Sequence, residues 1–384
     1  MANILYHSVE PENNAVSYSE FSTADFILTG DGRKLVANSV RLEGQISVNK
    51  NGQTKTQALI TANEGQWKVD NMVGLHSVCE SITTEVQSAG NIEHLASYPR
   101  YVKLAAASSK EAVDFLSAEM VAERRGPTAS NGEYAVEPVA ALNLDANIGG
   151  NALLITTADP SFSIKMMNCL NRMSANYSFD KNGYVKVSIN FARANQALFG
   201  IDCDGTMSYS LSNLRLSYKT VADDGKDEKV LMRSYFSTKS TIQSQSATIQ
   251  SRVPSDTVLG CSICFLKQSN EGDAVENAYG LEKLPNIENV KYMFSDTQNR
   301  FISYSITETS DLIDRGIKSL QYAGHSSATQ LKLKANDCFI AGVDFPAPVS
   351  LRNQKFTFSV DTTSQTLSGT PYLCFLYFHT IIQL

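Results

Sequence analysis

The sequence predicts an all-β protein made of two tandem eight-stranded antiparallel jelly rolls (a double jelly roll), with a few short helices in the connecting loops. Short stretches with the alternating polar and apolar residues of a half-buried strand recur through both halves of the chain. Each half ends on one long strand, at 207–221 and at 371–384. About eight strands and one helix in each half are the pattern of a jelly roll.

A polar segment separates the two halves, because 222–229 reads ADDGKDEK and holds no apolar residue larger than alanine. A chain of 384 residues is long for one domain and suits two. The start of the chain is polar and turn-prone, which predicts an extended arm rather than a packed element. The predicted organisation is an N-terminal arm at 1–20, a first jelly roll at 21–222, a polar linker at 223–229 and a second jelly roll at 230–384.

The strand at 207–221 organises the first half. Its sequence, MSYSLSNLRLSYKTV, alternates apolar residues with serines up to Leu211, and the alternation resumes one residue out of phase at Leu214. A one-residue slip inside a strand is typical of a β-bulge, which we expect at Ser212 and Asn213.

The other strands of the first half are identified by the same alternation and by flanking turn residues. They are expected at 21–29, 39–48, 153–157, 162–167, 176–179 and 184–191. Asn51 and Gly52 predict a tight turn after the second of these strands. The segment 180–183, DKNG, predicts a hairpin loop between the last two. The apolar residues of 74–86 also fit a helix period, but its β-branched residues and the turn that follows lead us to prefer a strand.

A helix is expected at 108–125. Ser108 and Glu111 form a capping box at its start. Arg124 and Arg125 suit the negative end of the helix dipole. We prefer this interpretation of the two arginines to that of a small basic patch. A Gly-Pro pair then stops the helix, and the residues up to 150 are expected to form a loop.

The second half repeats this plan. Strands are expected at 231–236, 248–252, 258–266, 290–294, 301–306, 338–343, 356–360 and 372–382. One helix is expected at 311–322, where Leu312, Ile313, Ile317 and Leu320 share a face.

The composition is that of a globular protein, with 42% hydrophobic and 19% charged residues. A formal net charge of −6 argues against direct nucleic-acid binding, which needs a basic surface. Seven cysteines without a disulfide-framework spacing favour folding in a reducing compartment. The N-terminus lacks the pattern of a signal peptide, so we expect folding inside a cell and no secretion.

No catalytic, cofactor-binding or metal-binding residues are predicted. The sequence lacks G-x-S-x-G, H-E-x-x-H, a Walker loop and G-x-G-x-x-G, and no cofactor is expected. The five histidines are scattered without ligand spacing. His76 and His94 are weighed as a metal pair, and we prefer two unrelated structural histidines.

Two acidic or cysteine motifs are also interpreted as structural. Cys261 and Cys264 have the spacing of half a zinc site, but no second half exists and their flanks are those of a buried strand. Asp202, Asp204 and Gly205 match the start of a calcium loop without its later ligands, so we prefer a turn.

Several segments, taken in order, carry a resemblance to a known family. They are 162–200 (FSIKMMNCLNRMSANYSFDKNGYVKVSINFARANQALFG), 209–218 (YSLSNLRLSY), 70–98, 344–345, 354–356 and 371–384. Together they resemble the double jelly-roll major capsid proteins, the lineage of adenovirus hexon and of tailless, often membrane-containing phages. The first run is similar to a pattern late in the first roll of these proteins, F-x-I-K, L-N, G-x-V-x-V-x-I-x-x-A and L-F-G.

The resemblance implies a structural virion protein and no enzyme. Three copies would form a pseudo-hexagonal homotrimeric capsomer that tiles an icosahedral shell. Its partners would be neighbouring capsomers and penton, vertex and minor capsid proteins, and an internal membrane under the shell is left open. The arm at 1–20 would be disordered in the isolated chain and ordered on assembly.

Two alternatives remain. One is a minor, vertex or receptor-binding jelly-roll protein, which has the same strand pattern. The other is a glycan-acting hydrolase built on paired jelly rolls, which needs an acidic pair in a groove between them. Trp67 is the only tryptophan, a poor basis for stacking sugars and a better anchor for a subunit contact.

Overall fold

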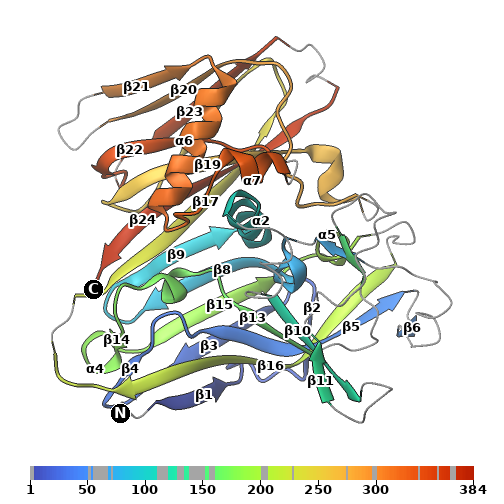
Figure 1. Cartoon of the computed structure of the whole chain (residues 1–384), viewed down its shortest axis with the longest axis vertical. Coiled ribbons are helices and arrows are strands. Elements are labelled where there is room, and N and C mark those ends of the chain that lie inside the picture. Colours follow the sequence, from blue (N-terminus) through green and yellow to red (C-terminus); the bar gives the residue numbers. More distant parts are fainter. Residues whose placement is uncertain are drawn as a thin grey trace.

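Two β-sandwiches follow one another along the longest axis of the molecule, and the first half of the chain forms the lower one in Figure 1. The expected all-β double jelly roll is confirmed, and its helices lie in the connections between strands. The computed structural model describes residues 4–50, 53–54, 68–70, 72–109, 120–127, 134–137, 152–154, 161–199, 206–226, 229–273, 276–295, 301–335, 338–352, 354–363 and 369–384.

Eight strands form the second roll as two four-stranded sheets. They are β17 (Leu231–Ile242), β18 (Ser246–Ser251), β19 (Val258–Lys267), β20 (Ile287–Ser295), β21 (Phe301–Ile306), β22 (Ala341–Val349), β23 (Phe356–Thr362) and β24 (Tyr372–Gln383). One sheet has the order β22-β19-β24-β17 and the other β18-β23-β20-β21. Counted within the roll, these orders are 6-3-8-1 and 2-7-4-5, the winding of a jelly roll.

The first roll winds in the same way. Its strands are β1 (Leu5–Val9) with β2 (Ser17–Ser19), then β3 (Thr23–Leu28), β5 (Arg41–Lys50), β8 (Cys79–Val86), β9 (Gly90–Ala96), β13 (Ser161–Lys165), β15 (Val185–Phe191) and β16 (Met207–Ala222). One sheet runs β13-β5-β16 with β1 and β2 on the far side of β16, and the other runs β9-β8-β15-β3. Within this roll the orders are again 6-3-8-1 and 5-4-7-2.

Shorter elements extend or connect these sheets. The additional strands are β4 (Arg33–Leu35), β6 (Gln53–Thr54), β7 (Lys68–Asp70), β10 (Met120–Pro127), β11 (Tyr134–Glu137), β12 (Ala152–Leu154) and β14 (Tyr177–Ser178). The helices are η1 (Gly74–Val78), α2 (Tyr98–Ser109), η3 (Cys169–Arg172), α4 (Phe179–Asn182), α5 (Ala194–Ala197), η4 (Gln268–Glu271), α6 (Thr309–Tyr322) and α7 (Gln330–Ala335). The helix expected at 311–322 is therefore confirmed as α6, whereas α7 was not expected.

Strand β16 has the slip that its sequence predicts. Its pairing with β5 shifts register between Ser212 and Arg215. Asn213 lies at this shift with a φ of 51°, in the left-handed region that asparagine tolerates. On either side of the shift, alternate residues are buried, so the bulge keeps both apolar runs facing the core.

The described part of the expected N-terminal arm is extended but is not separate from the first roll. Strand β1 pairs antiparallel with residues 216–220 of β16, and β2 pairs with residues 210–212. Without them β16 would expose a row of unpaired backbone N–H and C=O groups. The interpretation of this stretch as disordered in the isolated chain is therefore wrong for the residues of β1 and β2.

The helix expected at 108–125 is wrong. Helix α2 ends at Ser109, and β10 occupies Met120–Pro127, where Arg124 and Arg125 lie on a strand paired with β11. The hydroxyl of Ser108 donates to the carbonyl of Ala105, 3.0 Å away, so it lies in a last turn rather than at a helix start. In the expected loop up to 150, β11 is described. Helix α2 is buried from residue 98 to 108, so no polar face marks it in the sequence.

Strands β14 and β15 do not form the hairpin expected around 180–183. Strand β14 pairs with β4, whereas β15 pairs with β3 and β8 in the opposite sheet. Helix α4 and Gly183, with a φ of 77°, carry the chain from one sheet to the other. Turn residues signal a reversal of the chain, but not which sheet receives the next strand. The turn expected at Asn51 and Gly52 lies outside the described residues.

Helix α6 lies close against β22 because two glycines face each other. A Cβ placed on Gly342 would be 2.7 Å from the Cα of Gly316. A Cβ placed on Gly316 would be 2.9 Å from the carbonyl of Ala341. The backbones of helix and strand therefore approach more closely than any larger residue permits.

We predict that Gly316→Ala destabilises the protein by about 1–3 kcal/mol, because overpacking outweighs the gain in helix propensity. Urea unfolding followed by circular dichroism measures this loss. The control is Gly272→Ala, whose Cβ would have only Asn195 Nδ2 nearby, at 3.9 Å. A Gly316→Ala protein as stable as the control would show that this approach is not tight.

Candidate functional site

The two rolls meet through one continuous sheet. Strand β9 of the first roll lies parallel to β17 of the second, so a single eight-stranded sheet runs β22-β19-β24-β17-β9-β8-β15-β3. Phe236 lies opposite His94 in this ladder, and the hydroxyl of Ser234 donates to the carbonyl of Ile92. The rolls are thus joined by hydrogen bonds as well as by the chain, and we call this contact the junction.

Helix α2 belongs to the first roll and holds the second through Arg100. This side chain is buried, and its guanidinium donates to the backbone carbonyls of Ala278 and Gly280. It also lies over the ring of Phe375 on β24, with its central carbon 4.0 Å from the ring centre. A planar group with five donors satisfies both contacts together.

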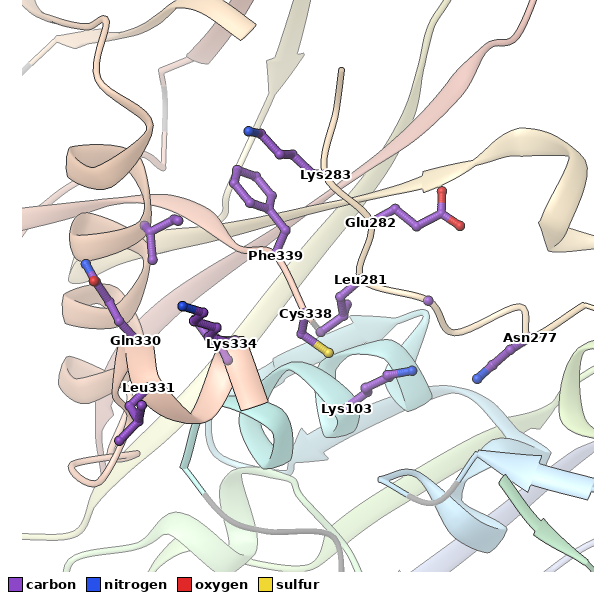
Figure 2. A pocket seen from close by; sticks show the side chains of 13 residues that line it. Lys103, Asn277, Leu281, Glu282, Lys283, Gln330, Leu331, Lys334, Cys338 and Phe339 are labelled. Carbon is purple, nitrogen blue, oxygen red and sulfur yellow. The ribbon is translucent and has the colours of Figure 1, made fainter. Parts of the chain in front are cut away.

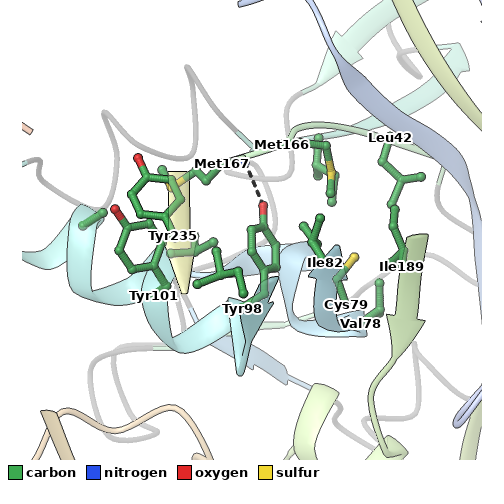
Figure 3. Packing of buried hydrophobic residues seen from close by; sticks show 14 of the residues in the cluster. Leu42, Val78, Cys79, Ile82, Tyr98, Tyr101, Met166, Met167, Ile189 and Tyr235 are labelled. Carbon is green, nitrogen blue, oxygen red and sulfur yellow. Dashed lines mark hydrogen bonds between the residues drawn. The ribbon is translucent and has the colours of Figure 1, made fainter. Parts of the chain in front are cut away.

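Tyr101 of α2 is the centre of an aromatic cluster at the junction. Its ring centre lies 4.7 Å from that of Tyr235 and 5.4 Å from that of Tyr377, both in strands of the second roll. Figure 3 shows the rings of Tyr101 and Tyr235 side by side. The hydroxyl of Tyr101 is 3.0 Å from Nε2 of His325. Aromatic pairs in such contact add about 0.5–1.5 kcal/mol each beyond the burial of their area.

A buried ion pair completes the junction. Lys103 of α2 binds the carboxylate of Asp70, which is fully buried. The amide of Asn277, from the second roll, donates to the same carboxylate at 2.6 Å, and the backbone N–H of Met72 donates to its other oxygen at 2.8 Å. One carboxylate therefore ties together both rolls and the start of η1.

Sequence reasoning missed these three residues of α2. A signal was present, because Arg100 and Lys103 stand within the otherwise apolar run YPRYVKLAAA. Charged residues enclosed by an apolar run are either at the surface of a helix or buried with partners. Choosing between these requires knowledge of the second roll, which lies about 180 residues further along the chain.

We predict that Asp70→Asn lowers the free energy of unfolding by about 3–5 kcal/mol, because it leaves the Lys103 ammonium buried without a counter-charge. The control is Asp256→Asn, which breaks an ion pair with Arg352 whose two side chains are each 56% exposed. We expect the control to lose about 0–1 kcal/mol in the same urea titration. Equal small losses in both variants would contradict the role given to Asp70.

A groove of about 1000 Å³ opens beside the junction (Figure 2). Its lining is Lys103, Asn277, Gly280, Leu281, Glu282, Lys283, Ile313, Gln330, Leu331, Leu333, Lys334, Cys338 and Phe339. Among the described residues of this lining, Glu282 is the one carboxylate, and its oxygens accept from the backbone N–H of Lys267 and the amide of Asn270. Glycoside hydrolysis by the usual mechanism uses two carboxylates, and the described part of the lining supplies one.

Cys261 and Cys264 lie on β19, as the buried strand expected there requires. They are three residues apart, so their side chains point to opposite faces of the sheet. Cys261 packs in the core of the second roll, and Cys264 packs in the cluster that includes α2. Two thiols on opposite faces of one strand cannot bind the same ion.

The two histidines weighed as a metal pair have different surroundings. Nδ1 of the buried His76 is 2.7 Å from the hydroxyl of Tyr98, whereas the exposed His94 is 3.0 Å from the hydroxyl of Thr83. In the described ranges, no group of three or more His, Cys, Asp or Glu side chains has the arrangement of a metal site. Asp202, Asp204, Gly205 and Trp67 lie outside the described residues.

Among the titratable groups enclosed in the core, Glu93 and His379 have shifted pKa values. Burial raises the pKa of Glu93 to about 7, although its carboxylate accepts from the backbone N–H of Cys169 and the hydroxyl of Thr84. Burial, with the charge of Arg233, lowers the pKa of His379 to about 3. Both belong to packed interiors and neither lines the groove.

We predict that Glu93→Gln flattens the pH dependence of stability. The native state favours the protonated carboxyl, so its contribution is complete below pH 4.5 and is lost as pH rises to about 7. An amide mimics the neutral form, so at about pH 8 the variant should be more stable by as much as about 3 kcal/mol. Chemical unfolding across this range measures the difference, and a variant that is less stable at every pH would refute the assignment.

Within the described ranges, no helix is long and apolar enough to cross a membrane. No protein-family model matches the sequence, and no curated protein matches it. The remaining comparison is therefore with solved structures.

Two solved structures share this fold over the whole chain. The Faustovirus major capsid protein matches 100% of this chain and 90% of its own, with a TM-score of 0.60 and 9% sequence identity. The VP54 protein of PBCV-1, in a structure fitted into a reconstruction of the virophage Sputnik, matches 100% of this chain and 95% of its own, with a TM-score of 0.52 and 10% identity. The resemblance to double jelly-roll major capsid proteins is thus confirmed for the fold.

Proposed function

We propose that this chain is a major capsid protein, a structural protein of the virion whose copies tile an icosahedral shell. The junction is the observation that carries the proposal, because it holds two similarly wound rolls as one body. The fold of the Faustovirus major capsid protein, matched over the full length of this chain, supports it. No catalytic activity is part of the proposal.

The proposed assembly unit is a homotrimer. Two rolls in each of three copies supply six similar lobes, and six lobes around one axis form a pseudo-hexagonal block. The polar segment 223–229 would divide the lobes, since β16 ends at Ala222 and β17 begins at Leu231. Copies that meet through two different surfaces form a closed ring when the rotation between them closes.

The proposed partners are neighbouring capsomers and the penton, vertex and minor capsid proteins of the same shell. Contacts of this kind bury areas of standard size or larger and need no reactive groups. The net charge of −6 supports a protein that does not bind the genome directly. An internal membrane beneath the shell is compatible with the proposal and is not required by it.

We predict a native mass of about 126 kDa, three times the 42.0 kDa of one chain, that persists on dilution. Size-exclusion chromatography with light scattering measures it. A chain that stays at 42.0 kDa at every concentration would contradict the capsomer and favour the hydrolase alternative. An electron micrograph that shows the protein only at the five-fold positions of particles would favour a vertex protein.

A further inference from the structure

The junction uses a different edge strand from each roll, so in the described part of the chain the equivalent edge strand of the other roll stays free in each case. In each roll, the first strand lies at the edge of one sheet and the fifth strand lies at the edge of the other. At the junction, the fifth strand of the first roll (β9) pairs with the first strand of the second (β17). The equivalent strands, β1 with β2 and β21, have no such neighbour among the described strands.

The two free edges lie at opposite ends of the molecule. In Figure 1, β1 lies at the bottom near the N-terminus and β21 lies at the top. A chain whose two halves meet edge to edge, with the matching edges at its two ends, is suited to head-to-tail association. Such heterologous contacts close into rings when the rotation between copies permits.

Exposed apolar side chains lie on or beside β1 and β2, which together form this edge. Eight large hydrophobic residues are exposed in the described chain, and five of them lie between residues 4 and 21. These five are Ile4, Leu5, Tyr6, Val16 and Phe21. Tyr6 is 76% exposed, although Lys219 lies over its ring. Apolar residues gathered on one surface mark a contact with another molecule.

Neither free edge has the usual protection against pairing. Natural edge strands are blunted by lysine, other inward-pointing charges or proline. Strand β1 reads LYHSV and β21 reads FISYSI, with no lysine, arginine, carboxylate or proline in either. Ser303 and Ser305 of β21 are exposed, so small side chains leave its backbone accessible to a neighbouring strand.

We propose that β1 of one copy docks beside β21 of a second copy, repeating between chains the contact that β17 and β9 make within one. The junction supplies the model for this contact, a short parallel ladder supported by serine hydroxyls, as where Ser237 donates to the carbonyl of Ala96 at 2.8 Å. Only the number of copies, three, rests on the proposed function. The choice of edges comes from the topology of this chain.

Substitution of one edge at a time tests the proposal in the full-length protein. Tyr6→Lys places a charge on the β1 edge, and we expect the mass to fall from about 126 kDa to 42.0 kDa. The matched control is Tyr322→Lys, in α6, where the tyrosine is 45% exposed. The control should keep the native mass, and circular dichroism reports whether each variant is folded.

Mixing two variants tests the direction of the contact. Ser303→Lys blocks the β21 edge and leaves β1 intact, so this variant alone should also be monomeric. A mixture of Tyr6→Lys and Ser303→Lys retains one free edge of each kind, and we expect capped dimers of about 84 kDa and nothing larger. A contact of β1 with β1, by contrast, would let Ser303→Lys associate alone.

The outcomes separate the inference from the proposed function. Folded Tyr6→Lys and Ser303→Lys proteins that both keep the mass of the unaltered trimer would overturn the edge contact and leave the capsid proposal standing. An unaltered protein that is monomeric at every concentration would overturn both. If Tyr6→Lys keeps the trimer but loses flotation with vesicles of phosphatidylcholine and phosphatidylglycerol, the exposed residues face lipid and the edge contact is wrong.

Discussion

The buried polar contacts of helix α2 are the constraint on which the arrangement of the two rolls depends. The buried guanidinium of Arg100 donates to two carbonyls of the second roll, and the carboxylate of Asp70, paired with Lys103, accepts from the Asn277 amide of that roll. Separating the rolls would remove both carbonyl partners of Arg100 and the Asn277 partner of Asp70, and it would expose the aromatic cluster around Tyr101. The relative position of the rolls is therefore specified by hydrogen bonds, with the apolar contacts adding to its stability.

The proposed role as a subunit of a shell requires a fixed position of the two rolls. A tile whose halves moved independently could not present the same outline to every neighbour. The structure meets this requirement with a sheet that passes through both rolls and a helix that covers the joint (Figure 1). The same continuity explains why one hydrophobic cluster contains residues as distant in sequence as Tyr98 and Tyr377.

The sequence predicted the strands and helices in which buried and exposed residues alternate regularly. Strand β16, including its bulge at Asn213, and the helix α6 have one buried face each, so their periods are visible. Helix α2 is buried on all sides and has no such period. The capping-box pattern at Ser108 predicted the start of a helix at the residue where α2 is about to end. Strand β1 could not be identified because its five residues lack alternation and its pairing depends on β16, more than 200 residues away. The candidate site was harder to predict from the sequence than the fold, because Arg100 and Asp70 have hydrogen-bond partners in the second roll.

Electron cryomicroscopy of the purified protein tests most directly the claim that the two rolls form one rigid unit of a capsomer. We predict three-fold symmetric particles with six β-lobes, in which the two lobes of each copy keep the arrangement of Figure 1. Isolated two-lobed chains whose lobes vary in relative orientation would contradict that claim.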